Sequence, residues 1–374
     1  MRLEQRVWDA AEGWHGEAAL PEAQLVLVFG GRDGLAPASL DRLAHDYPGA
    51  ILAGCSTAGE IAGTHVHDDH AVATAVRFAG TPVRAVHIDL QQGEASEAAG
   101  ARLAAQLPAA GLVHVLVFSD GQHVNGSALV AGMQQRLPAG VQLTGGLAGD
   151  GPRFQHTLTV AAGEAREDRI VAVGFYGPRL RVGFGSLGGW DPFGPQRRVT
   201  RAVGNVLYEL DGQPALALYK RYLGDQSAGL PATGLLFPLS LRRDDGGEVV
   251  RTILAVNEAD QSMTFAGDIP EGLMVRLMKA NFDRLVDGAH GAAETSQAAL
   301  GSDHAELALL ISCVGRKLVL KQRVEEELEA VQQVVGHGAA LAGFYSYGEI
   351  CPAAPAASCE LHNQTMTITT FAEA

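Results

Sequence analysis

Long apolar runs are missing from this sequence, and cysteine is scarce. No segment approaches the roughly 20 consecutive apolar residues that cross a bilayer, and the first residues lack the apolar core of a secretion signal. There are 4 cysteines and no C-x-x-C pair, which disfavours a zinc site or a disulfide framework. We therefore expect a soluble, cytoplasmic protein with reduced cysteines and no membrane partner.

Positive charge is also in short supply. Lysine and arginine number 28 against 42 aspartates and glutamates, which gives a net charge of −14. No stripe of basic residues stands out, so binding to nucleic acid or to an anionic membrane is disfavoured. The enzyme signatures G-x-S-x-G, G-x-x-x-x-G-K-[ST] and H-E-x-x-H are absent as well. We predict a protein that is not an enzyme.

Apolar residues, in contrast, are plentiful. The chain has 374 residues, of which 47% are hydrophobic and 19% charged, as is typical of a well-packed globular protein. This length exceeds what one ordinary core supports, so we expect two domains.

A Gly-rich turn that ends in a carboxylate occurs twice. The segment 53–61 reads AGCSTAGEI, and the segment 342–350 reads AGFYSYGEI. Five positions are identical without gaps, and they include the pair Glu60 and Glu349. A shorter relative, LTGGLAGDG at 143–151, places Asp150 near the glutamate position.

The turns belong to a larger repeat. Apolar runs typical of strands buried on both faces occur at 25–29, 113–118 and 307–313, and each precedes a helical segment and then one of the turns. We predict an α/β fold of two pseudo-symmetric domains, built from repeated strand-helix-strand units with mixed sheets and outer helices. Residues 182–194 are expected to be a connector, and 318–335 the longest helix.

The turns and other motifs resemble the FIST family. The motifs in order are CSTAGEI, TGGLAGDG, VTRAVGNVLYELDG, SCVGRK, GFYSYGEI and CELHNQTMTITT, and they span nearly the whole chain. The resemblance implies an N-terminal FIST domain over 1–197 and a C-terminal FIST domain over 198–374. It implies a ligand-binding sensory protein of bacterial signal transduction. Some standalone two-domain members are haem proteins that sense nitric oxide and regulate a partner histidine kinase or diguanylate cyclase.

Ligands of α/β sheets bind beyond the carboxyl ends of the strands, where the three turns are expected to lie. Carboxylates there would bind an ammonium group, and arginines after the first strand of a unit would bind a carboxylate through two hydrogen bonds. This chemistry suits a small amino-acid-like metabolite. The alternative is that each glutamate caps backbone amides of its own repeat and that the arginines form internal ion pairs. The candidate ligand-binding residues are Arg32, Ser56, Thr57, Glu60, Asp150, Arg316, Tyr345, Ser346, Glu349, His362 and Asn363.

Haem needs an axial ligand, most often histidine. His362, at the start of the last strand and close in sequence to the third turn, is the candidate, with a structural histidine as the alternative. The His-rich segment 65–70 contains metal-ligating residue types, but no third ligand is evident. His123 is expected to be a loop residue.

Three other functions stay open from the sequence. The ligand could be an amino-acid-like metabolite in place of a gas bound to haem. Glu60 and Glu349 could serve as the carboxyl pair of an enzyme. The chain could also be a scaffold with a vestigial pocket.

Overall fold

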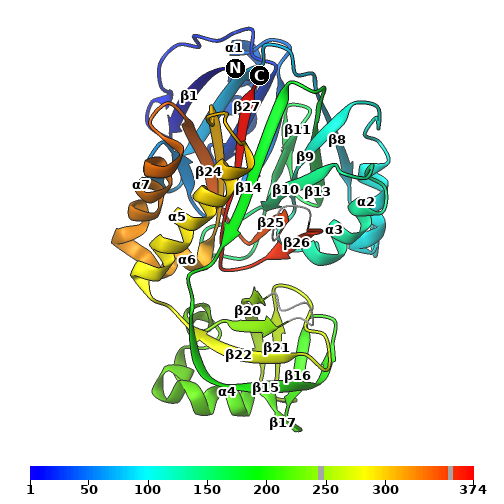
Figure 1. Ribbon diagram of the computed structural model, residues 1–374, viewed down its shortest axis with the longest axis vertical. Helices are drawn as coiled ribbons and strands as arrows, with labels where there is room; N and C mark the ends of the chain where they lie inside the picture. The colour runs from blue at the N-terminus through cyan, green and yellow to red at the C-terminus, as the bar shows by residue number, and fades with distance from the viewer. Residues whose placement is uncertain (243–247, 353–356) are drawn as a thin grey trace.

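The computed structural model describes residues 1–242, 248–352 and 357–374. It has a mixed α/β fold with mixed sheets, repeated strand-helix-strand units and helices on the outside (Figure 1). The predicted fold class is confirmed. None of the described helices is both long and apolar enough to cross a membrane.

The repeated unit occurs three times. In each copy a buried strand runs parallel to a second strand after a helical connection, and a later strand lies antiparallel on the other side of the first. The first unit is β3 (Leu25–Gly30), α1 (Pro37–Asp46), β4 (Ile51–Ser56) and β7 (Ala71–Arg77). The second is β9 (Leu112–Ser119), α3 (Gly126–Gln134), β10 (Gln142–Leu147) and β13 (Arg169–Tyr176). The third is β23 (Leu307–Cys313), α7 (Val324–Val335), β24 (Ala340–Ser346) and β27 (Met366–Glu373).

The three units exchange strands in a cycle. The strand after each turn leaves its own unit and pairs antiparallel with the second strand of another: β5 (Glu60–Ala62) with β24, β25 (Gly348–Pro352) with β10, and β11 (Thr159–Ala161) with β4. Each unit therefore completes the sheet of another. We call this closed arrangement, residues 1–190, 280–352 and 357–374, the ring.

One glycine in each unit sets this geometry. A Cβ on Gly54, Gly145 or Gly343 would lie only 1.8 to 1.9 Å from a carbonyl oxygen of the neighbouring parallel strand. Only glycine allows the backbones to approach so closely. The three glycines therefore occupy equivalent positions in the three units. Residues that follow these glycines at the same distance along the chain are then equivalent too, which aligns Glu60 with Glu349 and with Gly151. Asp150 lies one residue before the glutamate position.

The region between β14 (Leu180–Leu187) and α5 (Phe282–Ala299) forms a separate sheet. Its long strand β15 (Asp191–Val203) pairs with β22 (Met274–Lys279), which leads back to the ring. We call residues 191–279 the inserted sheet; it lies below the ring in Figure 1. The predicted connector at 182–194 was wrong, because strands occupy most of it. The predicted boundary between the two domains, between residues 197 and 198, lies inside β15.

The remaining elements complete these sheets and their outer layer. In the ring they are β1 (Arg2–Asp9), β2 (Gly13–Trp14), β6 (His65–His67), β8 (Val83–Asp89), α2 (Ser96–Ala104), β12 (Glu164–Arg166), α6 (Val314–Leu320), η3 (Lys321–Arg323) and β26 (Cys359–His362). In the inserted sheet they are β16 (Val206–Leu210), β17 (Gln213–Pro214), α4 (Ala215–Leu223), η1 (Gly224–Gly229), η2 (Ala232–Leu236), β18 (Leu239–Arg242), β19 (Glu248–Arg251), β20 (Ile253–Asn257) and β21 (Ser262–Phe265).

The helix predicted at 318–335 is broken. Lys321 follows α6 with φ of +51°, a left-handed conformation that stops the helix before α7 begins at Val324. The longest described helix is α5, with 18 residues.

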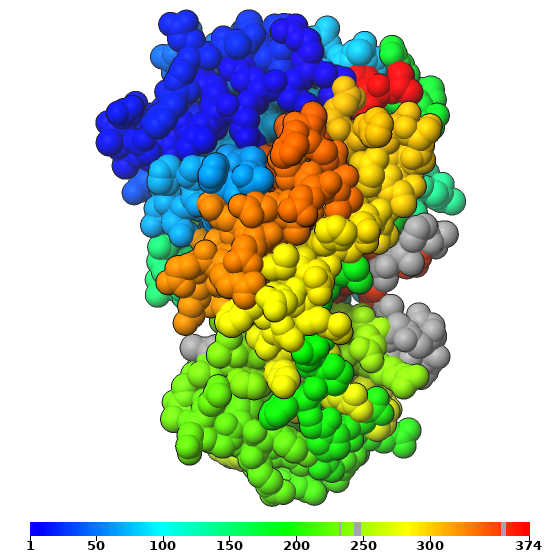
Figure 2. Space-filling view, turned by 60° about the vertical axis from the view of Figure 1, so that its left-hand side comes forward, coloured from blue at the N-terminus to red at the C-terminus, as the bar shows by residue number. Residues whose placement is uncertain are grey.

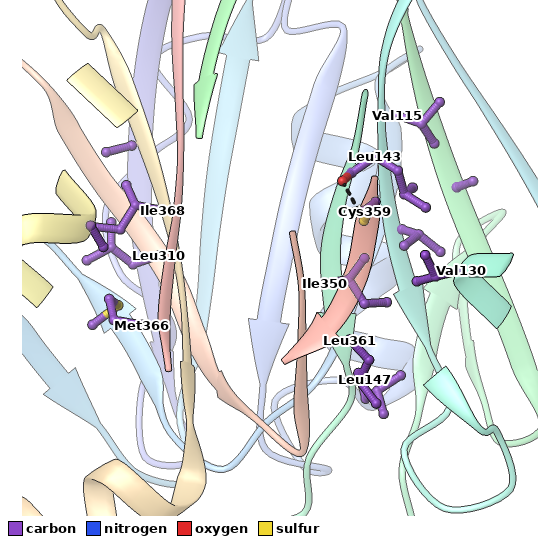
Figure 3. Packing of buried hydrophobic residues seen from close by; sticks show 14 of the residues in the cluster. Val115, Val130, Leu143, Leu147, Leu310, Ile350, Cys359, Leu361, Met366 and Ile368 are labelled. Carbon is purple, nitrogen blue, oxygen red and sulfur yellow. Dashed lines mark hydrogen bonds between the residues drawn. The ribbon is translucent and has the colours of Figure 1, made fainter. Parts of the chain in front are cut away.

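Apolar side chains fill the spaces between the sheets and their helices. Leu143, Leu147, Ile350 and Leu361 pack around the second unit, and the Sγ of Cys359 donates a hydrogen bond to the Leu143 carbonyl at 3.1 Å (Figure 3). All four cysteines are buried and unbridged.

Candidate functional site

The three turns meet at one end of the ring. Backbone amides join them in pairs: Ala58 donates to the Tyr345 carbonyl at 2.8 Å, Gly149 to Ser56 at 2.8 Å, and Tyr347 to Leu147 at 3.2 Å. Sequence reasoning thus found three segments, far apart in the chain, that the fold brings together.

The two turn glutamates point into the protein. Glu60 is bonded to Thr57 and accepts from the His70 amide at 3.2 Å. Glu349 accepts from Ser346 at 2.6 Å and from the Thr365 amide and hydroxyl. Burial raises the pKa of each carboxyl to about 8, because little solvent is present to stabilise the charge. Both glutamates therefore accept hydrogen bonds from residues of their own repeat unit.

The two predicted arginines occupy unrelated positions. Arg316 is fully buried on α6 and forms an ion pair with Glu327 at 2.8 Å. Arg32 is exposed and pairs with Glu167 at 2.9 Å. By sheet register Arg32 corresponds to Val314, so the shared Gly-Arg dipeptide does not mark equivalent positions.

Other predicted residues, apart from Asn363, also form hydrogen bonds inside the ring. The Ser56 hydroxyl donates to the Gly149 carbonyl, and Asp150 accepts from Arg153 at 2.8 Å. The Tyr345 hydroxyl donates to Glu327 at 2.7 Å. Asn363 is buried, and its side-chain amide has no hydrogen-bond partner among the described residues.

His362 lies in β26. Its Nε2 is 2.9 Å from the Cys351 carbonyl oxygen, and its side chain is 8% exposed. It therefore occupies a buried position on the edge strand of its sheet.

A cavity of about 1350 Å³ lies between the turn end of the ring and the inserted sheet. The outline of the molecule narrows where these two parts meet (Figure 2). The ring contributes loop residues 121–126, the second and third turns, and α6, whereas the inserted sheet contributes η1, η2, β20 and β21. None of the eleven predicted residues is among those that line this cavity, whereas Tyr347, which follows Ser346 in the chain, does line it.

The cavity wall is mainly apolar and is partly open to solvent. Leu254, Phe282 and Leu318 line it and are 43%, 46% and 37% exposed. They are three of the five large apolar side chains that are exposed in the described residues. Exposed apolar groups gathered at one place mark a binding surface more often than a solvated one.

His123 is the one histidine on this wall among the described residues. Its Nδ1 is 2.8 Å from Oδ1 of Asp168 and 3.6 Å from Oδ1 of buried Asp120. The potential ligand atoms of these three residues lie within 4.8 Å of one another. In the His-rich segment, His65 instead contacts Glu325, and the His67 and His70 rings pack 5.1 Å apart.

Sequence reasoning missed this cavity because its residues carry no motif. Its walls come from the ring and from a sheet inserted between β14 and α5. The exposure of apolar residues such as Leu254 and Phe282 could have marked the cavity, but exposure is known only from the structure.

Two models of known protein domains match this chain. A model of the FIST N domain matches residues 24–213, and a model of the FIST C domain matches residues 215–352. This chain belongs to the FIST family. FIST domains are sensory, ligand-binding domains of signalling proteins.

Two individual proteins are similar to this FIST protein. An uncharacterized protein of Methanocaldococcus jannaschii, MJ1623, is 29% identical over 161 residues, which are 39% of this chain and 31% of that protein. The chain therefore spans about a third of the length of this curated relative. The crystal structure of cyanuric acid hydrolase from A. caulinodans aligns with 100% of this chain and 98% of its own at a TM-score of 0.39 and 11% identity.

Proposed function

We propose that this chain is a cytoplasmic sensory protein of bacterial signal transduction whose small ligand binds in the cavity between the ring and the inserted sheet. The observation that carries the proposal is the cavity itself, with apolar side chains left exposed on walls from both parts. Pockets of this kind, mostly apolar with a few polar groups, are the usual binding sites for small molecules. The proposal is for binding without catalysis.

Side-chain polar contacts join the two parts at several places in the described residues, and Asp191 contacts Asn281 at 3.0 Å and Arg284 at 3.4 Å. Asn125 donates to Asp268 at 3.0 Å, Arg251 donates to the Leu361 carbonyl at 3.0 Å, and Gln364 donates to the Leu235 carbonyl at 3.3 Å. A ligand that touches both walls binds the closed arrangement more tightly and shifts the equilibrium toward it. That shift would change the surface offered to a partner signalling enzyme, such as a histidine kinase or a diguanylate cyclase.

Exposed cavity leucines test this proposal. We expect the double variant Leu254→Gln, Leu318→Gln to weaken binding of the neutral apolar dye N-phenyl-1-naphthylamine about tenfold, because polar side chains replace apolar contact area. Leu187 is the matched control, since it is 45% exposed and lies outside the cavity wall. Fluorescence titration measures both. Equal affinity for the double variant and Leu187→Gln would rule out the cavity as the site.

Haem is the second candidate ligand, and it fits His123 better than His362. The Nε2 of His362 already contacts a backbone carbonyl, and the residue lies outside the cavity wall, so it does not fit as an axial ligand. The contact of His123 with Asp168 uses Nδ1, which leaves Nε2 for a metal and places a carboxylate behind the ring. Bound haem would supply an iron that binds nitric oxide.

An absorption spectrum separates these assignments. If the purified protein takes up haem, we expect a Soret band that shifts with nitric oxide, that is lost in His123→Ala and that is retained in His362→Ala. A band lost only in His362→Ala would restore the sequence-based assignment. A colourless protein that takes up no added haem would exclude the haem candidate and leave the cavity to another ligand.

A further inference from the structure

We infer that the cavity selects an amphipathic anion: a ligand with an apolar body of more than one ring or an equivalent chain, and a carboxylate, sulfonate or phosphate group. This inference rests on the proposed function, because it names the chemical class that the proposed site would bind. It differs from the zwitterionic metabolite that the arginine and glutamate turns suggested.

The distribution of lysines is the first observation. The chain has only four lysines. Lys220 pairs with Glu258, and Lys317 pairs with Asp68.

The other two lysines, Lys279 and Lys321, are exposed and line the cavity. Neither has a carboxylate within 4.0 Å among the described residues, although the protein carries 14 more negative than positive charges. Two uncompensated cations at one cavity of an acidic protein create a local positive potential that attracts anions.

The backbone at Lys321 is the second observation. This residue ends α6 with φ of +51°, a conformation that glycine adopts without steric cost and that side chains with a Cβ disfavour. The chain carries a lysine where glycine would stabilise the helix end. A position that retains an unfavourable backbone conformation at a cavity wall is a candidate for function.

The chemistry of the described lining residues favours an anion over a zwitterion. Among the described residues that line the cavity there is no aspartate or glutamate, so the ammonium group of an amino acid would find no counter-charge on this part of the wall. Apolar side chains instead surround the space, among them Phe154, Phe237 and Phe265. An anion with an apolar body satisfies both the lysines and the wall.

A matched pair of dyes tests the inference. 8-Anilinonaphthalene-1-sulfonate has the same ring skeleton as N-phenyl-1-naphthylamine and adds one sulfonate. We expect the double variant Lys279→Gln, Lys321→Gln to raise the Kd of the sulfonate dye about tenfold, because two partly exposed ion pairs with the sulfonate are lost. The Kd of the neutral dye should change less than twofold. Lys220→Gln is the control and should change neither.

The outcomes separate the two proposals. If the leucine variant loses both dyes while the lysine variant binds the sulfonate dye normally, the cavity binds ligands but does not select anions, and the inference fails alone. If the leucine variant binds both dyes normally, the cavity proposal fails, and the inference fails with it. Circular dichroism spectra that match the parent confirm that each variant is folded.

Two sources of this chemistry are distinguishable. Haem carries carboxylates on an apolar ring. An aromatic or fatty acid of metabolism likewise carries a carboxylate on an apolar ring or chain. A Soret band that weakens in the lysine variant identifies haem as the anion. A colourless protein whose melting temperature rises with an apolar acid, and not with the corresponding amide, identifies a metabolite.

Discussion

Arg316→Met is expected to destabilise the protein by about 3–5 kcal/mol, because it leaves the carboxylate of Glu327 buried without its cation. Both side chains have no exposed area, and the guanidinium also donates to the carbonyls of Gly188 and Leu285. Arg316 thereby ties α6 to α7, to α5 and to the segment that leads into the inserted sheet. Urea unfolding, monitored by circular dichroism, measures the change.

The matched control is Arg32→Met. Arg32 also pairs with a glutamate, but the pair is exposed, and pairs of that kind contribute about 0–1 kcal/mol. The double variant Arg316→Met, Glu327→Leu should recover part of the loss, since no unpaired charge remains. A ligand-binding role alone for Arg316 predicts instead that Arg316→Met unfolds at the same urea concentration as the parent protein in the absence of ligand.

The second large effect concerns pH. The folded pKa of Glu60 and of Glu349 is about 8, well above the ordinary value of 4.5. Between these values the folded protein holds a proton that the unfolded chain releases. The free energy of unfolding therefore falls as pH rises from about 4.5 to 8, by at most about 1.4 kcal/mol per pH unit for each carboxyl.

Glutamine removes this titration and keeps the shape of the side chain. We expect Glu60→Gln, Glu349→Gln to be less stable than the parent or equal to it near pH 5, and more stable at pH 8. Melting temperatures at pH 5, 6, 7 and 8 provide the measurement. Buried His114, whose pKa burial lowers to about 3, adds stability as pH rises toward 6.5, so the difference between parent and variant isolates the glutamates.

Glu167→Gln provides the control for this comparison, because Glu167 is an exposed partner of Arg32. Above pH 5, the melting temperature of this variant should change with pH in the same way as that of the parent. If the parent and the double glutamine variant show the same pH dependence, the two buried carboxyls are ionised in the folded protein and the argument from burial is wrong.

The repeated elements of the fold could be predicted from the sequence. Strands buried on both faces leave continuous apolar runs such as 25–29, and a close approach of two backbones leaves a glycine such as Gly54. Both signals are local, and both depend on residue type alone. The three units were therefore visible before the structure, whereas the cyclic exchange of β5, β11 and β25 was not, since short strands carry too little pattern to reveal their partners.

The candidate site, in contrast, could not be predicted from residue types alone. Residue types suggested that Glu60, Glu349 and Arg316 face a ligand, but the same groups serve equally well in a buried network, and only the packing distinguishes the two uses. His123 and Lys321 carried no motif. Their place on one wall depends on an inserted sheet that approaches the turn end of the ring.

By itself, the sequence determined the α/β class, the repeat, the family and the acidic, motif-poor character of the chain, because these follow from local pattern and composition. Tertiary structure alone decided which polar groups are buried, which lysines have no carboxylate nearby in the described part of the chain, and where the cavity lies. The physical reason is that burial and ion pairing are properties of residues that meet across long sequence separations, such as Arg316 with Gly188 and Arg32 with Glu167.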